Sequence, residues 1–385
     1  MLARTVSLLK HRNSTRNGRR ALVHTPVKAV YTWPTVNRSV LANNRQKPFN
    51  GPPVAHPPSS FSMIYYCLTL LVGFLVLFKS ADQLVIGAVA TARHYKISPV
   101  LIGLTVVAFG TSAPEIFVSA VSSLEKTPQL AVGNAIGSNI TNLGMVLGVT
   151  ALFVPLKFKP EILQKDMPIL LFVTICAGVT LIDLHLGLWD GVLLLTVLGF
   201  FLYRLAADYK ASSNTDTSIE SGDLEAAPAL PKNSAIALFI GSLIFLLLSC
   251  ELLVWSAVNI AQLLDVSELI IGLTIIAVGT SLPELVVSIT SALREQAELA
   301  IGNIVGSNIF NILAVLSLPC VIAPTELSSD VLWRDYSVML ILTLLLIMLA
   351  FRTKAQASTN KANGVIFVSI WLGYLFFLYL TSSSG

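Results

Sequence analysis

A stretch of forty residues occurs twice in this chain, and each copy carries a glutamate directly after a proline in an apolar setting. The copies are Gly103–Asn142 and, 169 positions later, Gly272–Asn311; they align without a gap and share 22 identical positions. An ionisable side chain at membrane depth is energetically expensive, so Glu115 and Glu284 predict a functional site. Two such groups in duplicated segments are typical of transporters with internal repeats.

The composition indicates that most of the chain lies in a membrane. Of its 385 residues, 54% are hydrophobic and 12% are charged, whereas a soluble domain carries about 25% charged residues. A spanning helix needs roughly 20 apolar residues, and the sequence predicts ten such helices. Their predicted ranges are Ile64–Ala92, Pro99–Leu124, Leu130–Val154, Met167–Ile182, Leu188–Leu205, Ser234–Leu264, Glu268–Leu293, Leu299–Ile322, Val331–Phe351 and Gly364–Leu380.

A polar segment divides these spans into two halves. Residues 63–207 hold five spans, residues 208–233 form a linker rich in Ser, Thr, Asp and Glu, and residues 234–385 hold five more. Because five is an odd number, the second half enters the membrane from the opposite side, which predicts inverted repeats. We therefore expect an all-α membrane protein with ten transmembrane helices arranged as two inverted five-helix repeats.

Basic residues orient the predicted spans. The loops after the odd-numbered spans contain twelve Lys or Arg residues, whereas the alternate loops contain only Lys126 and Arg334. By the positive-inside rule, the linker is cytoplasmic and both ends of the helical core face outside. We expect a multi-pass protein of the cell membrane, or of the inner membrane where there are two.

Residues 1–62 differ from everything that follows. They contain ten Lys and Arg residues and no acidic residue, as Arg-rich transit peptides do. The alternative is an upstream extension, with Met63 as the true start. The extension is favoured, because a leader with ten positive charges would conflict with an outside N-terminus. In either case we expect the segment to be disordered.

The repeated motif brings its polar residues onto one helix face. In each copy, Ala, Thr, Ser and Glu follow the spacing i, i+3, i+4, i+7, and the next span adds a Ser and an Asn one turn apart. The proline before each glutamate disturbs the preceding turn. Carbonyl groups freed in this way are tolerated at membrane depth only where they line a cavity or bind something.

The groups offered by this motif are carboxylates, hydroxyls, amide oxygens and backbone carbonyls, without His or Cys. Such hard oxygen ligands suit sodium, calcium or magnesium better than transition metals. Calcium tolerates irregular oxygen cages, whereas magnesium demands near-octahedral geometry and keeps its water, so a protein-lined cage favours calcium. The four cysteines are isolated and form no CxxC pair, so we expect no disulfide framework, zinc site or resident cofactor.

Asp82 and Glu251 also correspond under the 169-residue offset, within the first and sixth spans. Lys79 precedes Asp82 by three residues, so a structural ion pair and a role on the ion access path are both open interpretations.

The sequences GTSAPE with GSNITN, and GTSLPE with GSNIFN, resemble the paired repeats of the calcium/cation antiporter superfamily. The resemblance covers the chain from Met63 and is closest to prokaryotic sodium/calcium exchangers. It implies a cation site formed by six residues from each half. These are Ala108 (carbonyl), Thr111, Ser112, Glu115, Ser138 and Asn142, with Ala277 (carbonyl), Thr280, Ser281, Glu284, Ser307 and Asn311.

Two departures refine the resemblance. Some family members, including potassium-dependent ones, carry Asp where this chain has Asn311. The pair Asn142 and Asn311 leaves two carboxylates in the cage and argues against potassium dependence. The GNATE-like motif of the proton/calcium branch is absent from this chain.

Charge supplies a mechanism for exchange. Two uncompensated carboxylates in a low-dielectric site are costly to move, so the empty carrier resists switching, while calcium or several sodium ions offset the charge and permit it. We expect a monomeric secondary antiporter that exchanges calcium for sodium by alternating access at a midplane site. Its expected partners are these ions and the lipid bilayer, without nucleic acid.

Two alternatives stay open: a proton-driven calcium antiporter of the same fold and, in a different class, a cation channel. An enzyme is not expected. Phosphoryl chemistry would need Arg or Lys converging on the site, and neither repeat core has a basic residue near its glutamate.

Overall fold

The computed structural model describes residues 59–95, 97–160, 162–214, 230–264, 277–352 and 359–383. The chain divides into two units, Met1–Ala55 and His56–Gly385, and all described residues belong to the second. The predicted leader, apart from its last four residues, and the centre of the predicted linker therefore lie outside the described residues. The beginning of the predicted seventh span lies outside them too.

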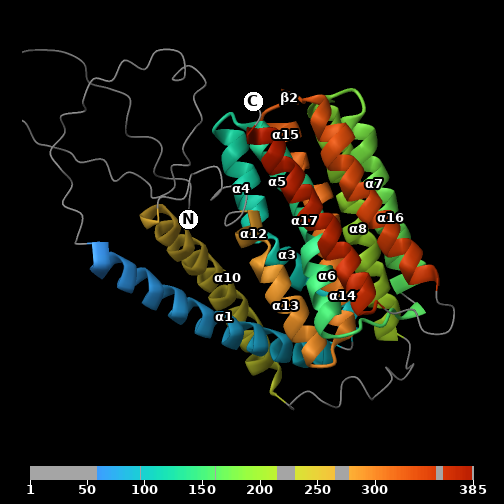
Figure 1. The fold of residues 1–385 in the computed structure, drawn as a ribbon. Helices are drawn as coiled ribbons and strands as arrows, with labels where there is room; N and C mark the ends of the chain where they lie inside the picture. Colours follow the sequence, from blue (N-terminus) through green and yellow to red (C-terminus); the bar gives the residue numbers. More distant parts are fainter. Residues whose placement is uncertain are drawn as a thin grey trace, which may run out of the picture. The chain divides into compact units, whose positions relative to one another are not determined.

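The described residues are almost entirely helical (Figure 1). Several helices continue through a π-helical segment (η), and two short strands pair at one end. In the first half the elements are α1 Ser59–Tyr95, α2 Pro99–Ile102, η2 Gly103–Val107, α3 Ala108–Thr111, α4 Ala113–Leu124, α5 Pro128–Thr141, η3 Asn142–Leu147, α6 Gly148–Phe153, η4 Ile162–Asp166, α7 Met167–Leu181, β1 His185–Leu186 and α8 Leu188–Asn214. In the second half they are α10 Lys232–Leu263, α12 Ala277–Thr280, α13 Leu282–Leu293, α14 Ala297–Phe310, η6 Asn311–Val315, α15 Ser317–Ile322, β2 Thr325–Glu326, η7 Val331–Tyr336, α16 Ser337–Arg352 and α17 Lys361–Ser383.

The apolar helices match the predicted spans. Among the described residues, eight helices are long and apolar enough to cross a membrane, and the bent pair Val100–Thr111 and Ala113–Leu124 forms a further one. The ends of these nine differ from the predicted ends by at most five residues. Helices α12 and α13 occupy the described part of the seventh predicted span. The predicted all-α membrane fold is confirmed.

The third and eighth spans form the centre of the bundle. In Pro128–Phe153 and Ala297–Ile322, 78% and 83% of the most apolar window is buried inside the protein, against 17–39% in the other six long spans. The outer spans instead expose large apolar side chains, such as Leu75 on α1 and Phe376 on α17. Such surfaces suit lipid, so among the eight long spans the third and the eighth are the most shielded from it.

Close helix approach at the centre depends on glycine. A Cβ atom on Gly302 of α14 would lie 2.6 Å from the carbonyl oxygen of Val100, and one on Gly306 would lie 2.7 Å from the Cβ of Ala108. Both distances are far below van der Waals contact. Small residues at helix interfaces permit this close packing in membranes, and here they bring α14 against the span that carries Thr111 and Glu115.

Loop pairings show the inverted relation of the two halves. At one end, β1 pairs antiparallel with β2, joining the loops after the fourth and eighth spans. Elsewhere, Thr359 donates its N–H to the Leu156 carbonyl at 2.8 Å, joining the loops after the ninth and third spans. The 169-residue offset relates Leu156 to Thr325 of β2. Five spans separate the loop of Leu156 from the loop of Thr325, and an odd number of crossings places these two loops at opposite ends of the bundle. The two loop pairings therefore also lie at opposite ends.

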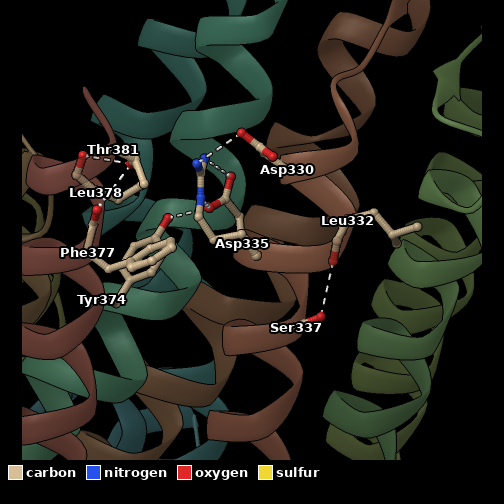
Figure 2. Close-up of polar contacts among 9 residues, drawn as sticks. Asp330, Leu332, Asp335, Ser337, Tyr374, Phe377, Leu378 and Thr381 are labelled. Carbon is tan, nitrogen blue, oxygen red and sulfur yellow. Dashed lines mark hydrogen bonds and ion pairs between the residues drawn. The ribbon is translucent and has the colours of Figure 1, made fainter. Parts of the chain in front are cut away.

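An aspartate ties the fourth span of each half to the fifth. Asp335 in η7 accepts a hydrogen bond from the Tyr374 hydroxyl of α17 at 3.0 Å (Figure 2), and Arg334 donates to Asp335 at 2.6 Å through Nε. In the first half, Asp166 at the end of η4 lies 3.8 Å from Arg204 of α8. Asp166 and Asp335 are related by the repeat offset, so one stabilising device is used twice with different partners.

Helices α1 and α10 lie side by side (Figure 1), in close contact at Gly87, where an added Cβ would lie 2.7 Å from the Phe239 nitrogen. Asp82 on α1 receives a hydrogen bond from Nε of Arg294 at 2.6 Å. The ion-pair partner of Asp82 in the described residues is therefore Arg294, at the end of α13, and not the neighbouring Lys79. The repeat counterparts of Asp82 and Arg294 are Glu251 and Glu125. Because both counterparts are acidic, they cannot form the same ion pair.

We predict opposite membrane sides for loops that are related by the repeat. Single-cysteine variants His185→Cys and Glu326→Cys, at exposed positions of β1 and β2, should react with a membrane-impermeant maleimide from the same side. Lys157→Cys should react only from the other side. Labelling in sealed vesicles, in a background lacking the four native cysteines, measures this. Reaction of all three from one side would contradict the inverted arrangement.

We predict that Gly302→Ala destabilises the protein, because its methyl group meets backbone atoms that cannot move away cheaply. Overpacking of this kind costs about 1–3 kcal/mol, which thermal unfolding in detergent would show as a lower melting temperature. Gly373→Ala in α17 is the matched control, because a Cβ there meets no atom within 4 Å among the described residues. Equal melting temperatures for the two variants would contradict the prediction.

Candidate functional site

The helix carrying Glu115 is broken directly before it. Helices α3 and α4 meet at a 43° bend at Ser112, whose φ of −81° and ψ of 6° leave the helical region. Ser281, at the equivalent position, has φ −92° and ψ 7°. In both halves the glutamate and its proline lie in the first turn of the next helix. The missing amide hydrogen of proline is harmless in a first turn, so the break and the sequence agree.

The predicted site residues are largely buried. The side chains of Thr111, Ser112, Glu115, Asn142, Ser281, Glu284, Ser307 and Asn311 are all 0% exposed. Ser138 is also buried, whereas Thr280 is half-buried. The two carboxylates therefore face the protein interior rather than lipid.

Residues from both halves meet around Glu284. Its Oε1 accepts a hydrogen bond from Ser112 Oγ of the first half at 3.0 Å and one from Ser307 Oγ at 3.4 Å. The Thr111 hydroxyl lies 3.5 Å from that of Ser307. The Ser112–Glu284 hydrogen bond thus joins residues that are 172 positions apart in the chain. Ser112 lies three positions before Glu115, so the bond links the surroundings of the two glutamates.

Most other polar atoms of the predicted set have no hydrogen-bond partner within the described part of the chain. Among the described residues, thirteen buried side-chain nitrogen and oxygen atoms lack a hydrogen bond, and eight of them belong to this set. They are both carboxylate oxygens of Glu115, Oε2 of Glu284, Oγ of Ser281 and both amide atoms of Asn142 and Asn311. Buried polar atoms are nearly always satisfied in native proteins. Oxygen atoms concentrated in this way can bind a cation.

The two backbone carbonyl groups of the predicted set, those of Ala108 and Ala277, are not equally well described by the structure. The Ala108 carbonyl accepts the Ser112 N–H at 3.0 Å and the Thr111 hydroxyl at 3.3 Å, so an ion at this carbonyl would compete with the longer bond. The main chain of Ala277 begins α12, directly after residues outside the described ranges. No side-chain hydrogen bond among the described residues links Ser138 or Thr280 to the other candidates.

Sequence reasoning missed two asparagines that support the glutamates. Asn134 of α5 donates through Nδ2 to the Glu115 carbonyl at 3.0 Å, and Asn303 of α14 does the same to the Glu284 carbonyl at 3.4 Å. A signal was available, because Asn134 and Asn303 occupy identical positions of the repeat, 19 residues after each glutamate. A lone asparagine in an apolar helix is most often a packing or back-bonding residue, so its presence alone does not indicate a functional role.

Comparison with known proteins gives a consistent result. Residues 65–206 and 234–380 match the profile of the sodium/calcium exchanger protein family. The chain is 41% identical to a protein named antiporter CaxA from Alkalimonas amylolytica, over 82% of this chain and 99% of that one. It is 30% identical to the sodium/calcium exchanger MaX1 from Methanosarcina acetivorans, over 81% of this chain and 98% of that one.

The fold agrees with solved structures as well. It superimposes on the sodium-calcium exchanger NCX_Mj, in a structure soaked with sodium and strontium, with a TM-score of 0.69 and 34% sequence identity, covering 80% of this chain and 97% of the other. The predicted class, ten transmembrane helices in two inverted five-helix repeats, is confirmed by this match together with the described spans.

The broken apolar spans, the repeat and the match over both halves lead to one conclusion: the chain is a multi-pass membrane protein and belongs to the sodium/calcium exchanger family.

Proposed function

We propose that this protein exchanges calcium for sodium by alternating access, at a site built around Glu115 and Glu284. The observation that carries the proposal is the Ser112–Glu284 hydrogen bond across the two halves. It lies in a buried group of residues in which three of the four carboxylate oxygens have no partner among the described residues. A cation held between the halves is positioned to respond to their relative movement.

The ligand chemistry supports calcium and sodium as the transported ions. The unpartnered oxygens come from two carboxylates, two amides and one hydroxyl. All are hard donors, and calcium accepts six to eight oxygens in irregular geometry. The two amides Asn142 and Asn311 add coordination without charge, so one calcium or two sodium ions would neutralise the two carboxylates. Relatives named as sodium/calcium exchangers support the same pair of ions.

Coupling follows from the cost of moving buried charge. Two carboxylates without a cation carry an uncompensated double negative charge, which a low-dielectric site stabilises poorly. Either ion load removes most of this penalty, so the loaded carrier reorients and the empty one resists. Such a carrier exchanges ions instead of leaking them.

We place the linker in the cytoplasm and the β1–β2 end outside. The support is the distribution of Lys and Arg, twelve against two between alternate loops, together with the positive-inside rule. A relative in Escherichia coli, 36% identical over 82% of this chain, is named inner membrane protein YrbG, which favours the cell membrane. Both halves of the site lie on one chain, so a monomer suffices for transport.

We predict that Glu115→Gln and Glu284→Gln each abolish sodium-driven calcium uptake in proteoliposomes while leaving expression intact. Each removes one of the two charges that an entering cation neutralises. Glu125→Gln, the same substitution at an exposed position directly after α4 and outside the site, should retain uptake. Robust exchange by both site variants would overturn the proposed site.

We predict that an outward sodium gradient drives calcium uptake into proteoliposomes containing the wild-type protein, and that a proton gradient of equal size does not. Sodium can occupy several oxygen ligands at once, whereas a proton would neutralise a single carboxylate. The gradients are imposed separately, with an ionophore to clamp the membrane potential. Uptake driven by protons alone would identify a proton/calcium antiporter on the same fold.

A further inference from the structure

Asn303 is a fully buried residue of α14 that bridges the two halves of the protein. It is 0% exposed, and its side-chain amide contacts three other groups. Thr111 Oγ1 of the first half donates to Asn303 Oδ1 at 3.1 Å. Asn303 Nδ2 donates to Ser288 Oγ at 3.1 Å and to the Glu284 carbonyl at 3.4 Å.

These contacts fix which way the amide points. The Glu284 carbonyl can only accept a hydrogen bond, so the Asn303 atom beside it must be the nitrogen. The oxygen then faces Thr111 and can only accept. Both N–H groups of the amide and one lone pair of its oxygen are used within the protein.

The fixed amide in turn sets the direction of the Thr111 hydroxyl. A hydroxyl binds a cation through an oxygen lone pair, so its proton must point at another acceptor. The acceptors within reach of the Thr111 hydroxyl include Asn303 Oδ1 at 3.1 Å, the Ala108 carbonyl at 3.3 Å and the Ser307 hydroxyl at 3.5 Å, and Asn303 Oδ1 is the nearest of these three. Donation to Asn303 leaves the Thr111 lone pairs free and releases the Ala108 carbonyl from that bond. One amide therefore makes two of the proposed ion ligands available together.

The other half has no equivalent link among the described residues. Asn134, the repeat counterpart, is half-buried and donates to the Glu115 carbonyl at 3.0 Å. The counterpart of Ser288 is Ser119, which donates to the Val315 carbonyl at 2.9 Å and not to Asn134. The bridge through Asn303 is thus a feature of one half.

We propose that Asn303 is a positioning residue for ion binding, which orients the Thr111 hydroxyl so that the Thr111 oxygen and the Ala108 carbonyl face the transported cation. This inference rests on the proposed function, because it concerns ligands of the same site. In this proposal Asn303 acts through Thr111 and is not itself one of the ion ligands.

The test replaces Asn303 by Leu, which has similar volume and no polar group, and by Ala. Initial rates of sodium-driven calcium uptake are measured in proteoliposomes over a range of calcium concentrations. Loss of a group that orients a metal ligand lowers metal affinity by about 10- to 100-fold. The KM for calcium should therefore rise about 10-fold or more while the maximal rate changes little, and calcium affinity in detergent should fall by a similar factor.

A matched control separates positioning from packing. Asn308→Ala changes the same residue type on the same helix, also buried, but the Asn308 amide bonds to its own helix at the Ile304 carbonyl. Its KM should stay near that of the wild type. In the background of Thr111→Val, Asn303→Leu should have little further effect, because the hydroxyl that it orients is already gone.

Three outcomes would overturn the inference. The first is an unchanged KM in a folded Asn303 variant, and the second is additive effects of the Asn303 and Thr111 substitutions. The third is failure of both Asn303 variants to fold, which would show that Asn303 is a structural residue. Glu284→Gln, assayed in parallel, distinguishes this failure from that of the proposed function. If Glu284→Gln abolishes uptake and Asn303→Leu resembles the wild type, the site stands and only the role of Asn303 is wrong.

Discussion

Two glutamates buried in an apolar helix bundle impose the constraint that the rest of this structure meets. A charged carboxylate pays a desolvation cost of several kcal/mol when it leaves water, and in a membrane the surrounding lipid offers no relief. The protein places Glu115 and Glu284 in the first turn of helices that follow a break. Negative charge is favoured there, because the unpaired N–H groups of a helix start carry partial positive charge.

The two glutamates are not equivalent, although their sequence surroundings nearly are. Glu284 accepts hydrogen bonds from Ser112 and Ser307 through one oxygen, whereas both oxygens of Glu115 lack a partner among the described residues. The duplicated sequence thus gives two different carboxylates. Hydroxyl groups partly orient that of Glu284, whereas the negative charge of Glu115 has no hydrogen-bond donor beside it among the described residues. In the proposed exchanger, compensation for this charge comes from the transported ion.

The inverted repeat explains how one chain brings the candidate site residues together from two directions. The two most buried of the eight long spans carry Ser138 with Asn142 and Ser307 with Asn311, and these two spans contact each other. Gly302 and Gly306 allow α14 to approach the broken helix of the other half closely. Toward the periphery the two halves diverge: Asp82 pairs with Arg294, while the corresponding positions Glu251 and Glu125 are both acidic. The two halves therefore keep the same residue types around the glutamates but differ in residue type at this peripheral pair.

Local signals determined much of this protein from its sequence. The apolar runs of the sequence predict the ends of nine described spans to within five residues. This succeeds because the cost of exposing backbone and polar groups to lipid is set by the residues of each span. The repeat identified the glutamates and their neighbours without any structure. Long-range contacts were decided only by tertiary structure: the bond from Ser112 to Glu284 joins residues 172 apart, and that from Arg294 to Asp82 joins residues 212 apart. Spacing along a chain specifies which helix face a side chain occupies, but packing decides which face of another helix meets it. For that reason Asn303 and Arg294 acquire their roles only in the folded protein.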